Sequence, residues 1–464
     1  MPKPNKNLSR KDFLKAAGVS VFSLLLSGTK PPDPPNINPV LSFADEAGRP
    51  QRPWWVKRVP KPTMEVDWSK MSRFDARDAV LGDGGNLADF IGETQAQAAL
   101  DHRERLEKER IQSAMPGFTL KDHVLRDAQA LNVADNSSLL GPPIPTPKER
   151  GVEKFQGTPE EAARIIRVAM RSFGAAQVGF VELDENTRKL IYAVDPDGKE
   201  IAFEVLDRAR ETDQKRIIPH QAKWVIAYTV RMSIENMRHA PSMISTQDSY
   251  SGYSRGRYIQ KHTQAFLTGL GYQGIGQVPL NGLGITPAFS VLAGHGEMSR
   301  LNRMITPEYG PMVRTFMMIT DLPVATDQPI DAGIMEFCKA CKKCSESCPA
   351  SALSRTDDPD WEGRGSWNNP GHQAYFEDAA KCLRYWFEES GSDCSICFSV
   401  CPFSKKDRAW VHSLAKASIA KIPHLDGMFR SLDDALSYGA QKNMKEWWHL
   451  DLPEHGLDPE QWKS

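Results

Sequence analysis

All eight cysteines of this 464-residue chain lie within one segment, between positions 338 and 401. Each half of the segment holds four of them and ends in a Cys-Pro pair. The first set is C-x2-C-x2-C-x3-C, formed by Cys338, Cys341, Cys344 and Cys348. The second set has its first cysteine displaced upstream and consists of Cys382, Cys394, Cys397 and Cys401.

The tight run followed by proline is the spacing with which bacterial ferredoxins bind [4Fe-4S] clusters. Since the fourth cysteine of each run ligates the other cluster in two-cluster ferredoxins, two clusters with exchanged ligands are predicted. The first cluster takes Cys338, Cys341, Cys344 and Cys401. The second takes Cys348, Cys382, Cys394 and Cys397. Such a segment conducts electrons, so another part of the chain must consume them.

Two other uses of cysteine fit the spacing less well. Disulfides between cysteines this close would be strained neighbouring bridges, and they leave the Cys-Pro endings unexplained. Structural zinc usually separates two CxxC pairs by a dozen or more residues, whereas the first four cysteines here fall within eleven positions.

The overall charge excludes a class of partners. Lys and Arg number 58 and Asp and Glu 59, so the net charge is -1, with a pI near 6.8. A nucleic-acid-binding chain is expected to carry a basic patch or stripe, and none is visible here. The composition is that of an ordinary globular protein, and no nucleic-acid partner is predicted.

The N-terminal residues look like a targeting signal. Basic residues precede a mostly apolar run at 16–26, and prolines follow it. The run is too short to span a bilayer as a helix, so an export signal is favoured over a membrane anchor. Ser9-Arg10-Lys11-Asp12-Phe13-Leu14-Lys15 resembles a twin-arginine signal with Lys11 in place of the second arginine. The alternative is an amphipathic helix that stays attached.

Local patterns divide the chain into five parts: a signal and Pro-rich linker at 1–44, an N-terminal unit at 45–155, a core at 156–328, the cysteine segment at 329–420 and a helical tail at 421–464. A capping box opens a helix at Thr158 that runs to Phe173. Hydrophobic runs predict strands at 177–183, 223–230 and 313–319, and a helix is predicted at 258–267. The alternation favours an α/β or α+β class in which helices flank a sheet.

Two motifs in the core are misleading. Residues 252–256 match G-x-S-x-G, but the polar residues before them do not form the buried strand that a nucleophilic serine requires. Residues 269–274 match G-x-G-x-x-G, but they follow a helix, and a helix C-cap explains them better. The chain also has no HExxH motif and no Asp-x-His-x-x-Gly motif of histidine-ligated cobalamin.

Motifs spread over nearly the whole chain resemble those of the respiratory reductive dehalogenases. They include the leader, the displaced cysteine and short runs at 52–57, 155–160, 270–272, 294–300, 305–310 and 320–323. The resemblance implies a corrinoid (cobalamin) bound base-off in a nitroreductase-like core, with a ferredoxin-like segment of two [4Fe-4S] clusters at the C-terminal side.

The same resemblance assigns roles to individual residues. It implies that Tyr253 donates a proton and that Asn281 and Arg314 complete the catalytic set. An ordinary turn asparagine remains open for position 281, since glycine follows it. The resemblance further places Gly294, Gly296 and Ser299 at the corrinoid.

The function implied is reductive removal of halogen from a small organohalide, as the terminal reductase of organohalide respiration. The implied partners are an integral-membrane anchor protein and an upstream electron donor, and the implied location is the outer face of the cytoplasmic membrane. Two alternatives remain open: a corrinoid enzyme that resembles epoxyqueuosine reductase and acts on tRNA, and an electron carrier without chemistry of its own.

Overall fold

The computed structural model describes residues 44–80, 87–131, 138–404, 430–431, 434 and 439–457. The predicted export signal and most of the predicted tail before residue 439 lie outside the described residues. Arg430, Ser431 and Asp434 of the tail are helical, and from residue 439 on the described part contains the short 3-10 turns η5 (Trp447–His449) and η6 (Glu454–Gly456). Within the described residues, no helix is long and apolar enough to cross a membrane.

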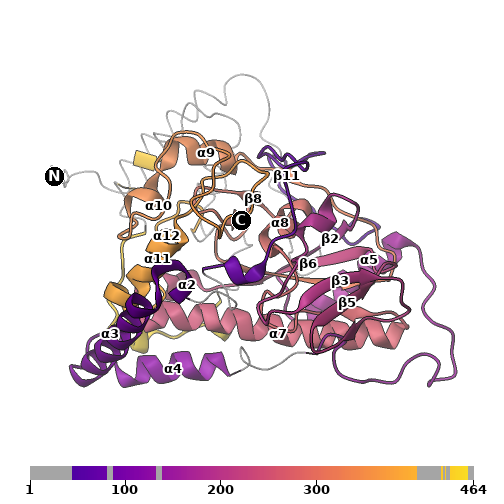
Figure 1. Cartoon of the computed structure of the whole chain (residues 1–464), viewed down its shortest axis with the longest axis horizontal. Helices are drawn as coiled ribbons and strands as arrows, with labels where there is room; N and C mark the ends of the chain where they lie inside the picture. Colours follow the sequence, from indigo (N-terminus) through magenta and orange to yellow (C-terminus); the bar gives the residue numbers. More distant parts are fainter. Residues whose placement is uncertain are drawn as a thin grey trace.

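A four-stranded antiparallel sheet lies at the centre of the core (Figure 1), with the order β2-β6-β10-β7. Its strands are β2 (Gln177–Glu182), β6 (Trp224–Arg231), β10 (Val313–Thr320) and β7 (Gly274–Ile275). Three of them confirm the predicted strands. β6 and β10 are buried along nearly their whole length because helices or loops cover both faces.

Helices α5 (Pro159–Ser172) and α7 (Met243–Leu270) cover one face of the sheet. α5 begins where the capping box predicted, because the Thr158 side chain accepts a hydrogen bond from the Glu161 N–H. α7 ends at Gly271, whose left-handed φ of 93° confirms the predicted C-cap.

The length of α7 differs from the prediction of a helix at 258–267. The helix begins fifteen residues earlier, at Met243, after Ser242 has capped it. Its first turns bury polar side chains from Ser245 to Ser249, so the usual hydrophobic stripe is missing there. A helix with a buried polar face is expected to serve a site rather than the core.

The other face of the sheet is covered by α8 (Thr286–Leu292) and a small sheet of order β3-β5-β4. Its strands are β3 (Glu200–Glu204), β4 (Arg210–Glu211) and β5 (Lys215–Pro219). Two-residue strands form two further pairs, which are β1 (Lys57–Arg58) with β11 (Ile330–Asp331) and β8 (Glu297–Met298) with β9 (Met304–Ile305).

The N-terminal unit, predicted at 45–155, packs against both the core and the cysteine segment. β1 pairs with β11, and α4 (Leu120–Ala130) packs along α7. α3 (Glu93–Gln112) packs against the helical turn at Trp386–Ser390, where Arg110 donates to the Glu389 carbonyl oxygen at 2.9 Å. The short α2 (Leu87–Ile91) precedes α3.

The cysteine segment contains only short helices joined by turns. They are α9 (Ile334–Cys341), α10 (Lys343–Glu346), α11 (Ala379–Tyr385) and α12 (Ile396–Ser399). α6 (Ile234–Met237) lies between β6 and α7 and contacts α12. Cysteines belong to the hydrophobic cluster here, together with Phe337, Tyr375 and Phe403, so the segment has its own buried centre.

Candidate active site and cluster-binding segment

Tyr253 on α7 and Arg314 on β10 lie against each other. The Arg314 Nη1 group donates to the Tyr253 hydroxyl at 3.4 Å, and the guanidinium carbon lies 4.8 Å from the centre of the ring. The Nη2 group donates to the Ser249 hydroxyl at 2.6 Å. The structure therefore brings together two of the three predicted catalytic residues and adds Ser249.

The periodicity of the sheet explains why Arg314 meets α7. Side chains alternate along a strand, so Arg314 shares its face with Phe316, and the edge of the Tyr253 ring meets Phe316 at a centroid distance of 6.0 Å. A Cβ on Gly252 would lie 3.0 Å from Arg314, and one on Gly256 would lie 2.2 Å from the ring of Phe316. The G-x-S-x-G motif thus marks the close approach of α7 to β10.

Asp248 is a buried carboxyl beside this pair that the sequence reading missed. It accepts hydrogen bonds from the Ser233 N–H at 2.7 Å and the Asn236 side chain at 3.1 Å. Burial raises the pKa of Asp248 to about 6, although the charges of Arg255 and Arg314 oppose the shift. The signal in the sequence was the polar run at 245–249 ahead of the motif.

Asp393 brings a second carboxyl close to Arg314 from the cysteine segment. Burial raises its pKa, while the positive charges of Arg103, Arg314 and Arg126 oppose that rise. Its backbone carbonyl accepts a hydrogen bond from the Thr246 hydroxyl on α7 at 3.5 Å. Because Cys394 follows directly in the chain, the cysteine segment contacts α7 through Asp393, whose carboxyl interacts electrostatically with Arg314.

Asn281 occupies a turn after Leu280 with a left-handed φ of 56°, which asparagine tolerates better than most residues. Among the described residues, it forms no hydrogen bond with Tyr253 or Arg314. The turn interpretation accounts for its backbone, and its catalytic role stays a prediction.

The three residues predicted at the corrinoid make contacts within the protein. Gly294 and Gly296 lack room for a side chain, since a Cβ there would lie 2.3 Å from the Gln328 carbonyl oxygen and 2.2 Å from that of Ile305. The Ser299 hydroxyl donates to the Arg303 carbonyl oxygen at 2.7 Å within the β8–β9 turn. Their contact with a corrinoid stays a prediction.

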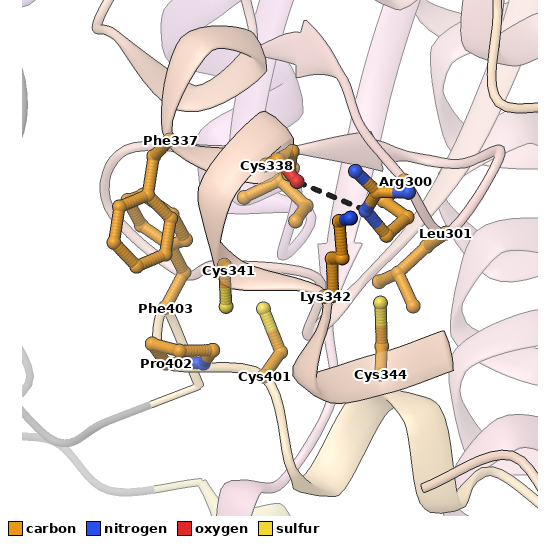
Figure 2. Close-up of a pocket in the computed structure, with 11 residues that line it drawn as sticks. Arg300, Leu301, Phe337, Cys338, Cys341, Lys342, Cys344, Cys401, Pro402 and Phe403 are labelled. Carbon is orange, nitrogen blue, oxygen red and sulfur yellow. Dashed lines mark hydrogen bonds between the residues drawn. The ribbon is translucent and has the colours of Figure 1, made fainter. Parts of the chain in front are cut away.

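Four cysteines surround one cavity in the cysteine segment (Figure 2). They are Cys338, Cys341, Cys344 and Cys401, the set predicted for the first cluster. The cavity has an empty volume of about 300 Å³, part of it open to solvent, and apolar side chains such as Phe337 and Phe403 line the rest. Within the described residues, no three His, Cys, Asp or Glu side chains converge on a single metal ion.

The other four cysteines lie close together and next to the first set. Burial raises the pKa of Cys382 most, and the charges of Glu377, Cys397 and Cys394 raise it further. Burial also raises the pKa of Cys394, and the charge of Cys348 adds to that rise. The pKa of Cys397 is raised by burial, by Cys394 and then by Cys344 of the first set. The division of these ligands between two clusters stays a prediction.

The thiols fit an iron-sulfur cofactor chemically. None of the eight, all of which lie in the described residues, forms a disulfide. Burial raises the pKa of Cys338 to about 12 and that of Cys394 to about 11, so the thiols stay protonated at neutral pH without metal. Coordination deprotonates such thiols outright, and buried thiols without metal are inert.

Comparison with known proteins identifies both parts of the chain. A model described as reductive dehalogenase subunit matches residues 134–206 and 203–324, and one described as 4Fe-4S double cluster binding domain matches 337–404. The second range contains all eight cysteines, which confirms the prediction of two clusters.

Similar proteins agree with these matches. The tetrachloroethene reductive dehalogenase of Sulfurospirillum multivorans is 35% identical over 319 residues, which cover 66% of this chain and 62% of that protein. The trichloroethene reductive dehalogenase of Dehalococcoides mccartyi is 31% identical over 350 residues, 67% of this chain and 60% of that protein. The chloroethene reductive dehalogenase of Dehalococcoides mccartyi strain VS is 26% identical over 99% of this chain and 100% of that protein.

A solved structure shows the same fold. A catabolic reductive dehalogenase superposes with a TM-score of 0.60 at 24% identity, covering 87% of this chain and 52% of that one. The chain belongs to the reductive dehalogenase family. The matched region spans about three fifths of the length of the first two relatives.

Proposed function

We propose that the protein reductively removes halogen from a small organohalide, with a corrinoid as the reacting cofactor and electrons supplied through two [4Fe-4S] clusters. The observation that carries the proposal is the Tyr253–Arg314 pair on α7 and β10, next to a double-cluster segment. Relatives with the same segments are named for chlorinated ethenes, which supports a halogenated substrate of that size.

The polar groups of the core suit a polar cofactor. Arg314 Nε and Gln277 Oε1 are buried and have no hydrogen-bond partner within the described residues. Such groups need a partner, and a corrinoid presents many amide donors and acceptors. A bound corrinoid would supply low-valent cobalt that cleaves the carbon–halogen bond.

Tyr253 is placed to give a proton to the carbon that loses the halogen. A phenol is ordinarily protonated at neutral pH. When its proton moves to the substrate carbon, a phenolate remains, and the Arg314 guanidinium at the hydroxyl stabilises that charge. Hydrogenolysis therefore uses one proton from Tyr253, whereas loss of two vicinal halogens forms a double bond and needs none.

The two sets of cysteines differ in their surroundings. The second set of cysteines contains Cys394, whose neighbour Asp393 feels the charge of Arg314. The first set lines the cavity that is partly open to solvent. Electrons are thus proposed to arrive at the first cluster and to leave from the second.

The cellular setting is part of the proposal. The twin-arginine-like leader supports export of the folded protein to the outer face of the cytoplasmic membrane, where an anchor protein and an electron donor would meet it. Expression of the full chain followed by fractionation tests this. Retention in the cytoplasm of a strain with an active twin-arginine pathway would contradict it.

Halide release tests the reaction itself. Purified protein reconstituted with cobalamin and clusters is expected to release chloride from chlorinated ethenes, without oxygen and under a strong reductant. Omission of either cofactor should stop the release. Bound corrinoid with no halide release from any organohalide would overturn the proposal and redirect the search to tRNA substrates.

A further inference from the structure

The turn between β8 and β9 carries two arginines whose side chains lie near different sets of cysteines. Arg300 and Arg303 lie three residues apart in this turn, which the Ser299 hydroxyl closes by donating to the Arg303 carbonyl oxygen. Arg300 lines the cavity of the first set of cysteines (Figure 2). The charge of Arg303 acts on Cys382 and Cys397 of the second set. One guanidinium therefore serves each cluster site.

Arg300 is a buried cation without an anionic partner. Its side chain is among the largest that are fully buried, with 1% exposed. Its hydrogen bonds all end on backbone carbonyl oxygens, among them those of Cys338 at 2.9 Å and Thr356 at 2.7 Å. Its guanidinium also lies 4.0 Å from the ring centre of Tyr375. No carboxylate of the described residues lies within ion-pair distance of it.

Arg303 differs in having a carboxylate partner. Its Nη1 group lies 2.5 Å from Glu377, whose side chain is 7% exposed. The Glu377 charge raises the pKa of both Cys382 and Cys397, while the charge of Arg303 lowers it. The two charges oppose each other at the second site, whereas the Arg300 charge is not neutralised at the first.

The acid Glu297 does not cancel the charge of Arg300 at the first site. Glu297 acts on the pKa of Cys338 less than Arg300 does. Its carboxylate is occupied by hydrogen bonds from Thr63 and from the N–H groups of Ala332 and Ile334. The first cluster site therefore retains an excess of positive charge.

We propose that the unequal pairing of these two arginines separates the reduction potentials of the clusters: Arg300, which has no carboxylate partner in the described residues, raises the first potential above the second, where Glu377 offsets Arg303. Reduction adds a negative charge to a cluster, and a buried cation favours the reduced form. Net charge and hydrogen bonding around the cluster are established determinants of its potential. With this order of potentials, the first cluster would hold an electron more tightly, and the second would be the stronger reductant. This inference rests on the proposed cluster ligation.

A redox titration of the protein with both clusters bound, followed by electron paramagnetic resonance, tests the proposal. Arg300→Gln is expected to lower the potential of the first cluster, and Glu377→Gln to raise that of the second. Both variants should narrow the gap between the two potentials, so the outcome needs no prior assignment of the signals.

Lys342→Gln is the matched control. Lys342 lines the same cavity, but its ammonium pairs with Asp357, whose side chain is 83% exposed. Solvent screens such a pair. Loss of the Lys342 charge should therefore change the difference between the two reduction potentials less than loss of the Arg300 charge does.

An unchanged or wider gap in Arg300→Gln, or a shift no larger than in Lys342→Gln, would overturn the proposal. If Arg300→Gln does not retain both clusters, Glu377→Gln decides alone, and an unchanged or wider gap in it overturns the proposal. Halide release is a separate measurement. An unchanged gap with normal release would refute only the role of the arginines, whereas absent release with the expected shifts would refute only the dehalogenation.

Discussion

The cysteine segment and the Tyr253–Arg314 site are built in opposite ways. All eight cysteines fall within 64 consecutive positions, on short helices and turns, and their spacing alone indicates the ligands. Tyr253 and Arg314 are 61 residues apart and meet because a long helix packs closely on a central strand. Cluster ligands can be predicted from their spacing in a single sequence. A pair of residues that tertiary packing brings together can be found only from a structure or from a family resemblance.

The largest effect is expected from the cysteine segment. Cys344→Ala removes a ligand of the first cluster and should abolish turnover supported by an external electron donor, because the electron path is interrupted. Iron content and halide release measure the two effects. Ser347→Ala, in the same run, serves as control and should keep both near wild-type values. Turnover at the wild-type rate in Cys344→Ala would show that this cluster is not in the path.

Tyr253→Phe tests the tertiary pair. It keeps the ring packed on Phe316 but removes the proton, and general acid catalysis contributes typically 10²- to 10⁴-fold. Hydrogenolysis should fall by about that factor, while elimination from a vicinal dihalide should fall much less. Tyr258→Phe on the exposed side of α7 is the control. Equal losses on both substrates would argue against the role as proton donor.

Asp248→Asn is expected to have an intermediate effect on stability that depends on pH. The folded-state pKa of about 6 lies above the ordinary value of 3.8, so the folded protein binds the proton more tightly than the unfolded chain. The contribution of Asp248 to the free energy of unfolding is fully present below pH ~4. As the pH rises through 6, this contribution of roughly 3 kcal/mol is lost.

The asparagine variant should lack this loss, so its melting temperature should rise relative to wild type between pH 4 and pH 7. Thermal unfolding of the two proteins across this range measures the difference. A difference that stays constant with pH would show that Asp248 does not titrate there.

The smallest effect is expected where the C-terminal region supports the site. The Trp447 indole donates to Asn236 at 2.9 Å, and Asn236 in turn donates to Asp248. Trp447→Phe leaves the Asn236 oxygen without this donor and should cost about 1 to 3 kcal/mol of stability. A lowered melting temperature checks it, with the exposed Trp54→Phe as control. Equal melting temperatures would mean that water replaces the indole.

Much of the fold was predictable because the signals were local. The capping box at Thr158, the C-cap at Gly271 and the hydrophobic runs of three strands all led to elements with nearly the predicted bounds. The start of α7 was missed because its buried side chains from Ser245 to Ser249 are polar, and burial of polar groups leaves no hydrophobic period.

The candidate site was predictable only in part for the same reason. Asp248 was missed because its burial between α7 and the loop at Ser233 comes from tertiary packing, which no spacing reveals. The glycines at 252 and 256 were visible as a motif, but their use as a contact surface for β10 depends on a strand some sixty residues later.

The adjacency of Asp393 and Cys394 links the two proposed sites through the backbone. One peptide bond joins a carboxylate that feels Arg314 to a sulfur assigned to the second cluster. Under the proposed assignments, a halide or organohalide bound beside Arg314 would change the electric field at that sulfur. Substrate binding would then be readable from the electron paramagnetic resonance line shape of the second cluster, with no label attached to the protein.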